Sequence, residues 1–153
     1  MSGIIGTDFL AQVGFIVEDV EKSKRKFAEF FGVEVPPNVY SDPYEISRAE
    51  YYGEPMKEAS CIMAFFTVGE GIKIELIQPN SSPSTWREFL DKHGEGVHHL
   101  AFRVKGMQDA ILSCENFGMA LTQKGENATG RYAYLDATKD LKVFLELLEN
   151  DPK

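Results

Sequence analysis

The chain has 153 residues, a formal net charge of −8 and a pI of about 4.9. Hydrophobic residues make up 43% and charged residues 26%, which is ordinary for a globular domain with a sizeable core. The longest basic cluster is short, at residues 22–26, so a nucleic-acid partner is not expected. We find no apolar run of membrane-spanning length and no signal-peptide pattern, and we expect a cytoplasmic protein without a membrane partner. Cys61 and Cys114 lie far from any cysteine pattern and are expected to be reduced thiols.

The first half of the chain begins with an alternating segment at residues 10–17 that predicts a strand. Asp19 can cap a helix that runs to about Phe31 and ends at Gly32. A short strand is predicted at residues 33–35, before two prolines. The long segment at residues 36–58 is either a functional lid or a pair of irregular edge strands joined by a loop.

The rest of the chain continues the alternation of strands and helices. We predict a hairpin from residues 61–68 and 72–78, a helix at 84–93, a strand at 96–104, a helix at 107–117, a short strand at 120–123, a polar loop at 124–129 and a closing hairpin from 131–136 and 141–148.

Two parts of the sequence repeat each other. Gln12-Val-Gly-Phe-Ile-Val corresponds to His99-Leu-Ala-Phe-Arg-Val, and each segment leads into a predicted helix that ends with Phe-Gly. Each half also has one carboxylate inside an apolar strand, Glu75 in the first and Glu146 in the second. The pattern predicts one α+β domain over residues 1–153, made of two βαβββ repeats at about 8–79 and 95–149.

Strand alternation places the four polar residues on one face. Gln12, Glu75, His99 and Glu146 all point away from the side of the sheet that the helices cover. That face is otherwise mostly apolar, which is typical of a ligand pocket with a few convergent polar groups. Gly14 and Ala101 would leave room there for a bound molecule, and the same alternation predicts that His98 is packed and hydrogen-bonded on the opposite face.

Three segments carry a resemblance to a known family: Gly94-Glu-Gly-Val-His-His-Leu-Ala-Phe-Arg-Val104, Lys73-Ile-Glu-Leu-Ile-Gln-Pro79 and Val143-Phe-Leu-Glu-Leu-Leu-Glu149. The chain resembles the vicinal oxygen chelate (glyoxalase/bleomycin resistance/dioxygenase) superfamily, and methylmalonyl-CoA epimerases in particular. The resemblance implies a cup-shaped mixed sheet with helices on its outer face, a homodimer, and a divalent metal ion inside the cup. Its implied ligands are Gln12, Glu75, His99 and Glu146, and the ion is Zn, Co, Ni or Mn.

The ligand types resemble a different branch of the superfamily. Epimerases of this kind usually have histidine where this chain has Gln12, and often glutamine where it has Glu75. The set of Gln, Glu, His and Glu is similar to that of zinc-type glyoxalase I. The surrounding sequence therefore favours an epimerase, and the ligand set favours a lactoylglutathione lyase.

The residues suggest one kind of chemistry for both enzymes. An ion with open positions can act as a Lewis acid on a carbonyl, which favours removal of a neighbouring proton. We expect Glu146 to act as the base and Glu75 as its partner on the opposite side, with an acyl-CoA or a thiol adduct as substrate. Arg103, Lys124 and Arg131 are either contacts for an anionic group of that substrate or ordinary surface cations. A third alternative is a small-molecule binding protein without turnover.

Overall fold

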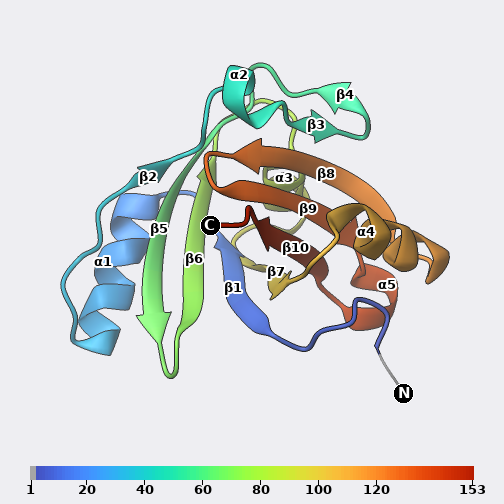
Figure 1. Cartoon of the computed structure of the whole chain (residues 1–153). Coiled ribbons are helices and arrows are strands. Elements are labelled where there is room, and N and C mark those ends of the chain that lie inside the picture. The colour runs from blue at the N-terminus through green and yellow to red at the C-terminus, as the bar shows by residue number, and fades with distance from the viewer. Residues whose placement is uncertain (1–2) are drawn as a thin grey trace.

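A single curled sheet of ten strands forms the centre of the computed structural model, which describes residues 3–153 (Figure 1). The strand order is β2-β5-β6-β1-β7-β10-β9-β8-β3-β4. The strands are β1 (Leu10–Ile16), β2 (Val39–Tyr40), β3 (Glu50–Tyr51), β4 (Glu54–Pro55), β5 (Cys61–Val68), β6 (Ile72–Pro79), β7 (Gly96–Arg103), β8 (Ala120–Asn127), β9 (Gly130–Asp136) and β10 (Phe144–Asn150). The helices are α1 (Val20–Phe31), α2 (Tyr44–Ser47), α3 (Thr85–His93), α4 (Met107–Asn116) and α5 (Thr138–Leu141).

The two halves of the chain form matching halves of this sheet. Strands β1 and β7 pair antiparallel at its centre, β1 also pairs parallel with β6, and β7 pairs parallel with β10. Gly14 lies opposite Glu75 in the first half, and Ala101 lies opposite Glu146 in the second. The predicted α+β fold with a cup-shaped mixed sheet is therefore confirmed, and the two parallel pairs have the same register.

Helices α1 and α4 cover the outer face of the two halves (Figure 1). The ring of Phe27 on α1 packs edge-on against Phe15 of β1 and stacks on Phe66 of β5. Asp19 caps α1 by accepting a hydrogen bond from the Lys22 backbone N–H, and the left-handed Gly32 ends the helix. A second apolar cluster lies between α4 and strands β7 to β10. The predicted bounds of both helices are confirmed to within about one residue.

A third apolar cluster lies on the inner side of the sheet. Trp86 and Leu90 of α3 pack there with Ile16, Ile77 and Tyr134. The Oγ of Ser84 accepts a hydrogen bond from the Arg87 backbone N–H and so caps α3 at its start. Helix α3, which connects the two halves, therefore supplies side chains to the interior of the cup.

Three local predictions were wrong. Residues 33–35 form no strand, because the chain pairs with β5 only after Pro36 and Pro37, at Val39–Tyr40. The predicted loop at 124–129 is mostly strand, since β8 continues to Asn127 in register with β9. The closing strand was predicted to begin at Leu141, but the short helix α5 occupies residues 138–141, so the strand begins at Phe144.

The segment at residues 36–58 connects the two edges of the sheet. Its first strand, β2, pairs with β5 at one edge, and its strand β3 pairs with β8 at the other. Helix α2 and strands β3 and β4 lie together at one end of the molecule in Figure 1. We call this segment the strap. It contains the expected edge strands, and it also contributes side chains to the cavity described below.

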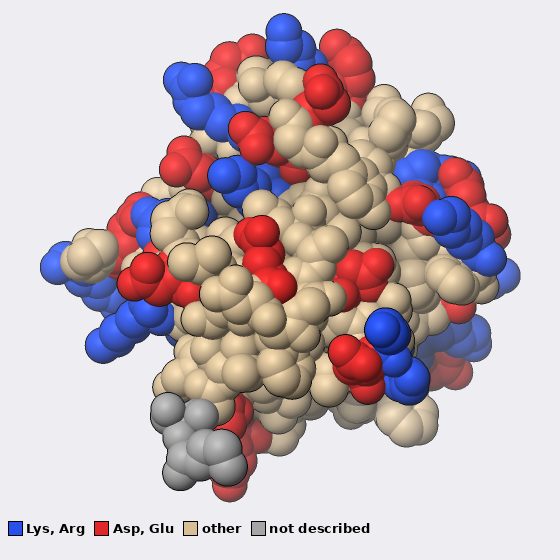
Figure 2. Space-filling model, turned by 90° about the vertical axis from the view of Figure 1, so that its right-hand side faces the viewer, with Lys and Arg blue, Asp and Glu red and all other residues tan. Residues whose placement is uncertain are grey.

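None of the helices within residues 3–153 combines the length and apolar character needed to cross a bilayer. On the face shown in Figure 2, lysine and arginine side chains lie among acidic ones and form no continuous basic surface. Cys61 and Cys114 are both buried free thiols, as expected.

Leu76 and Leu147 occupy equivalent positions in the two halves and are both fully buried, at 0% exposure. Replacing either with alanine is expected to lower the free energy of unfolding by about 2–5 kcal/mol, because each substitution leaves a cavity in an outer core. Denaturant titration measures the loss. Leu112→Ala, at a position that is 57% exposed, is the control and should change stability by less than about 0.5 kcal/mol. A small effect at only one of the buried leucines would contradict the equivalence of the two cores.

Candidate metal centre

The four predicted ligand residues come from the four central strands of the sheet. Gln12 is on β1, Glu75 on β6, His99 on β7 and Glu146 on β10. Glu75, His99 and Glu146 are buried, with exposures of 6%, 0% and 5%. Gln12 is half-buried and lines the same cavity as the two glutamates. The curled sheet thus brings side chains from both halves of the chain to one point.

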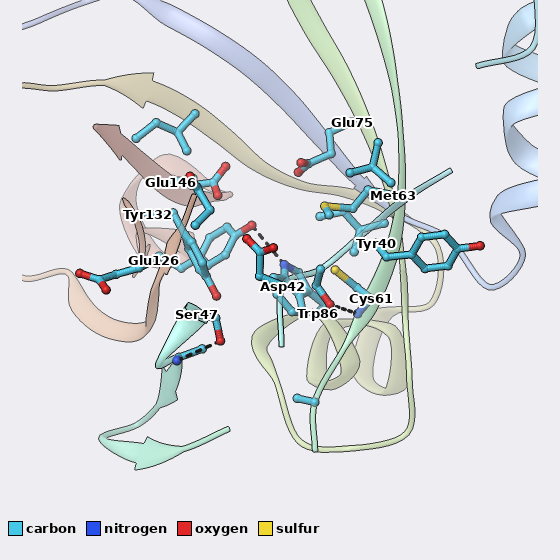
Figure 3. Close-up of a pocket in the computed structure, with 18 of the residues that line it drawn as sticks. Tyr40, Asp42, Ser47, Cys61, Met63, Glu75, Trp86, Glu126, Tyr132 and Glu146 are labelled. Carbon is cyan, nitrogen blue, oxygen red and sulfur yellow. Dashed lines mark hydrogen bonds between the residues drawn. The ribbon is translucent and has the colours of Figure 1, made fainter. Parts of the chain in front are cut away.

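Both carboxylates lie close to one nitrogen of His99. Its Nε2 is 3.3 Å from Oε1 of Glu75 and 3.1 Å from Oε2 of Glu146. One ligand atom from each of these three residues lies within 4.8 Å of the other two. Figure 3 shows the carboxylates of Glu75 and Glu146 facing each other across the cup. This spacing is compatible with a cation held between the three side chains.

Four polar atoms that face the centre of this cluster have no hydrogen-bond partner. Among the described residues, four buried side-chain atoms lack one: Oε1 of Gln12, Oε1 of Glu75, Nε2 of His99 and Oε2 of Glu146. The contacts between His99 and the glutamates are short but lack hydrogen-bond geometry. Leaving a buried polar atom unpaired costs about 1–3 kcal/mol, so four at one point need an explanation.

The donor set fits a divalent cation. One amide oxygen, one imidazole nitrogen and two carboxylate oxygens are ligands that suit Zn, Co, Ni or Mn. The charge of such an ion would offset the two buried carboxylates, and the ion would satisfy all four orphaned atoms. The residues present therefore fit the expected class of metal.

Burial and mutual charge shift the titration of this cluster. Burial raises the pKa of the Glu75 carboxyl above its usual value; His99 opposes this rise, and the charge of Glu146 adds to it. Burial by itself lowers the pKa of His99, but the adjacent Glu146 and Glu75 raise it to about 9 overall. Without a cation, the cluster thus holds a proton on His99 to balance its carboxylates.

The prediction that His98 faces away from His99 was wrong. In the pairing of β1 with β7, Gly14 lies opposite His99 and Phe15 lies opposite Val97, so His98 is an extra residue in a bulge. Both imidazoles pack edge-on against the ring of Tyr134. The bulge interrupts the alternation of side chains and brings two neighbouring histidines to the inner side of the sheet.

His98 orients the ring of His99, and its predicted packing and hydrogen bonding are confirmed. Its Nδ1 lies 2.9 Å from Nδ1 of His99, and its Nε2 lies 3.1 Å from Oγ1 of Thr85. Burial and the nearby His99 lower the pKa of His98 well below its usual value. A neutral His98 with its proton on Nε2 donates to Thr85 and accepts from Nδ1–H of His99. That arrangement leaves Nε2 of His99 free to bind a cation.

Gly14 makes room for His99 and not, as predicted, for a bound molecule. A Cβ at position 14 would lie 1.9 Å from Cε1 of His99, which is far inside van der Waals contact. The backbone of Gly14 has no left-handed conformation, so the space for the imidazole is the reason for glycine here.

Gln12, Glu75 and Glu146 line a cavity of about 340 Å³. Aromatic side chains that the sequence analysis did not single out form much of its wall, namely Trp86, Tyr132 and Tyr134. The Nε1–H of Trp86 donates to the hydroxyl of Tyr134, which fixes both rings. Tyr132 and Tyr134 are two residues apart on β9, so strand alternation could have predicted that both side chains point to the same face of the sheet. Trp86 lies on α3, which connects the two halves, and nothing in the sequence pattern indicated that its side chain reaches this cavity.

The strap lines the opposite side of the cavity. It contributes Val39, Tyr40, Ser41, Asp42, Ser47, Ala49 and Met56.

The three cations considered as contacts for an anionic group of the substrate do not line this cavity. Arg131 pairs with Glu149 and Asp151, Lys124 lines a smaller neighbouring cavity of about 240 Å³, and Arg103 lines neither cavity.

Comparison with known proteins settles the family. Residues 11–134 match the Glyoxalase/Bleomycin resistance protein/Dioxygenase superfamily. The chain belongs to this superfamily. A curated relative, the uncharacterized protein YqjC of Bacillus subtilis (strain 168), is 29% identical over 107 residues, which cover 68% of this chain and 76% of the relative.

Solved structures support the same fold. Methylmalonyl-CoA epimerase from Mycobacterium tuberculosis is similar with a TM-score of 0.65 and 20% identity, over 99% of this chain and 94% of that one. A variant of the Streptomyces coelicolor methylmalonyl-CoA epimerase in complex with 2-nitronate-propionyl-CoA has a TM-score of 0.64 and 17% identity, over 94% and 98%. At these identities the likeness shows the fold alone.

We expect Gly14→Ala to weaken divalent metal binding by about 10–100-fold, because the added methyl group displaces the imidazole of His99. Calorimetric titration of the metal-free protein with Zn²⁺ measures the change. Gly3→Ala is the control, since nothing lies within 4 Å of a Cβ at that position. Unchanged affinity in the Gly14 variant would show that His99 does not bind the ion.

Metal binding should release about one proton near pH 7.5, because His99 with a pKa of about 9 is protonated in the metal-free protein and neutral when it binds an ion. The apparent affinity should therefore rise up to about tenfold per pH unit until pH approaches 9, then level off. Calorimetry in buffers of different ionisation enthalpy counts the proton. An affinity that does not vary over this range would contradict the assigned charge of His99.

Proposed function

We propose that this protein is a metal-dependent epimerase or isomerase that moves a proton at the carbon next to a carbonyl, a reaction of the methylmalonyl-CoA epimerase type. The observation that carries the proposal is the group of four buried polar atoms without partners, from Gln12, Glu75, His99 and Glu146. Three of these side chains, Gln12, Glu75 and Glu146, line a cavity large enough for the reacting part of a substrate.

A bound divalent ion would supply Lewis acidity to the substrate carbonyl and stabilise the negative charge that develops on its oxygen. The chain itself positions the donors. Gln12 and His99 are neutral ligands when the ion is present, and Glu75 and Glu146 supply the compensating charge. The Thr85–His98–His99 chain of hydrogen bonds holds the imidazole in one tautomer.

The two glutamates can act on opposite faces of a substrate carbon. Their carboxylates face each other across the cup, on two sides of His99 (Figure 3). We assign Glu146 as the base that removes the proton and Glu75 as the acid that returns one from the other side. In the metal-free cluster, burial raises the pKa of the Glu75 carboxyl, so this side chain takes up a proton more readily than a glutamate in water.

The surroundings limit the access of water to this chemistry. Ile77, Trp86 and Tyr134 are nearly fully buried beside the carboxylates, and the strap forms the facing wall. Charges interact more strongly in such a site than in water, and a carbanion-like intermediate is protected from protonation at the wrong face.

One observation favours a second candidate, a glyoxalase I-like lyase of hemithioacetals. Gln12 offers an amide oxygen to the ion, and with two glutamates and one histidine it gives the donor set that resembles zinc-type glyoxalase I. Both reactions begin with removal of the same kind of proton. They differ in the carbon to which the proton returns.

Elemental analysis of protein never exposed to chelator should find about one divalent ion per chain, and the metal-loaded protein should exchange substrate protons with solvent deuterium. The panel contains methylmalonyl-CoA, a hemithioacetal and 2-hydroxyketones. Glu146→Gln is expected to lower the exchange rate by about 10²–10⁴-fold, because it removes the base, while the amide that replaces the carboxylate keeps an oxygen for the ion.

Glu115→Gln, at an exposed position on α4, is the matched control and should not alter exchange. Deuterium at the original carbon identifies epimerisation, and deuterium at the neighbouring carbon identifies the hydrogen shift. Metal binding without exchange on any substrate would favour the non-catalytic binding protein, and absence of metal binding would refute the proposal.

A further inference from the structure

The charged groups that line the cup have one sign. Of the residues that line the cavity within the described chain, four are charged, and all four are acids. They are Asp42, Glu75, Glu126 and Glu146. Lysine and arginine are missing from this lining, although the chain has sixteen such residues. The rest of the wall is mostly aromatic, aliphatic or sulfur-containing.

This lining has a consequence for anionic groups of a substrate. A carboxylate or phosphate that leaves water needs an arginine, a lysine or several N–H donors to replace its hydration. Three cations, Arg48, Lys124 and Arg131, line the neighbouring cavity together with Glu50 and Glu126. Arg131 is also paired with Glu149 and Asp151.

The charge balance at the metal centre also disfavours an anionic group on the substrate. A divalent ion is neutralised by Glu75 and Glu146, so no positive charge remains to hold a distant anionic group. Asp42 adds a further negative charge from the strap. It is half-buried, lines the cup, and has no ion-pair or hydrogen-bond partner among the residues that the structure describes. In Figure 3 the carboxylate of Glu126 points away from the other labelled acids, so Asp42 is the acid outside the metal cluster whose charge a substrate in the cup would meet.

The apolar part of the wall favours a matching substrate body. Trp86, Tyr132 and Tyr134 present ring edges and faces to the cavity, and Met56 and Met63 complete it. Ligand cavities span about 300–1,000 Å³, so a cavity of about 340 Å³ is a small one. It fits one ring or a branched aliphatic group beside the chelating atoms.

We propose that the substrate of this site is an uncharged carbonyl compound, in which a carbonyl and a neighbouring hydroxyl bind the ion and the remainder is an aromatic or aliphatic group without carboxylate or phosphate. The inference rests on the proposed function for the role of the ion. It selects the substrate class within that function and excludes substrates whose reacting part carries a carboxylate into the cup, as methylmalonyl-CoA would.

Trp86 is the chain's single tryptophan and lines the cup, so its fluorescence reports occupancy of the site. The probes are two derivatives of 2-hydroxyacetophenone that differ only in their para substituent, a carboxamide or a carboxylate. The two probes have the same chelating group and almost the same shape. On protein loaded with equimolar Zn²⁺, the carboxamide should bind at least about tenfold more tightly than the carboxylate, because the cup provides no counter-ion. Methylmalonyl-CoA is the third probe.

Asp42→Asn tests the charge argument directly. It should tighten binding of the carboxylate probe by at least about threefold, because it removes a nearby like charge, and leave the carboxamide probe within about twofold. Asp109→Asn, on the outer face of the second half, is the matched control and should change neither. Equal effects of Asp42→Asn on both probes would show that charge is not the cause.

Different outcomes would overturn the inferred substrate class and the proposed function. Carboxylate or methylmalonyl-CoA binding as tight as that of the carboxamide, on metal-loaded protein that exchanges substrate protons, overturns the inferred substrate class alone. Quenching of Trp86 that does not depend on the metal, or a protein that takes up no metal, overturns the proposed function as well.

Discussion

Two carboxylates buried in the interior of the sheet are the constraint on which this structure depends. Glu75 and Glu146 are almost fully buried, and their charges lie within a few ångströms of one another and of a single imidazole. Burying a charge without compensation costs far more than one hydrophobic contact provides. The fold is therefore stable around this point only with a proton on His99 or a cation in the cluster. The unpaired atoms of all four side chains favour the cation.

The symmetry of the sheet explains how the cluster is assembled. Each half places a glutamate on a strand that pairs in parallel with a central strand, opposite a small residue, Gly14 or Ala101. The two central strands pair antiparallel, so the two glutamates approach from opposite sides. The irregularities in the pairing match as well, because Ala11 is an extra residue directly before Gln12 in β1 and His98 is one directly before His99 in β7. The halves differ at Gly14, whose missing side chain leaves room for the imidazole of His99.

The sequence predicted the parts that follow from local periodicity. Alternation along the strands placed Gln12, Glu75, His99 and Glu146 on one face, and the duplication indicated that they meet. Alternation also led to the error at His98, because a bulge inserts one residue and leaves no mark in the pattern of apolar positions. The pairing of β3 with β8 joins residues about seventy positions apart and depends on the curvature of the whole sheet. Such long-range pairing has no local signal, so the strap's place across both edges was not predictable.

The strap and His99 are linked through helix α3. The hydroxyl of Tyr51 in the strap donates to the carboxylate of Glu88 on α3, and Thr85 at the start of that helix contacts His98. His98 in turn contacts His99. A residue of the strap is thus connected through α3 to the histidine that orients the ring of His99. The position of the strap and the orientation of the His99 ring therefore both depend on where helix α3 lies.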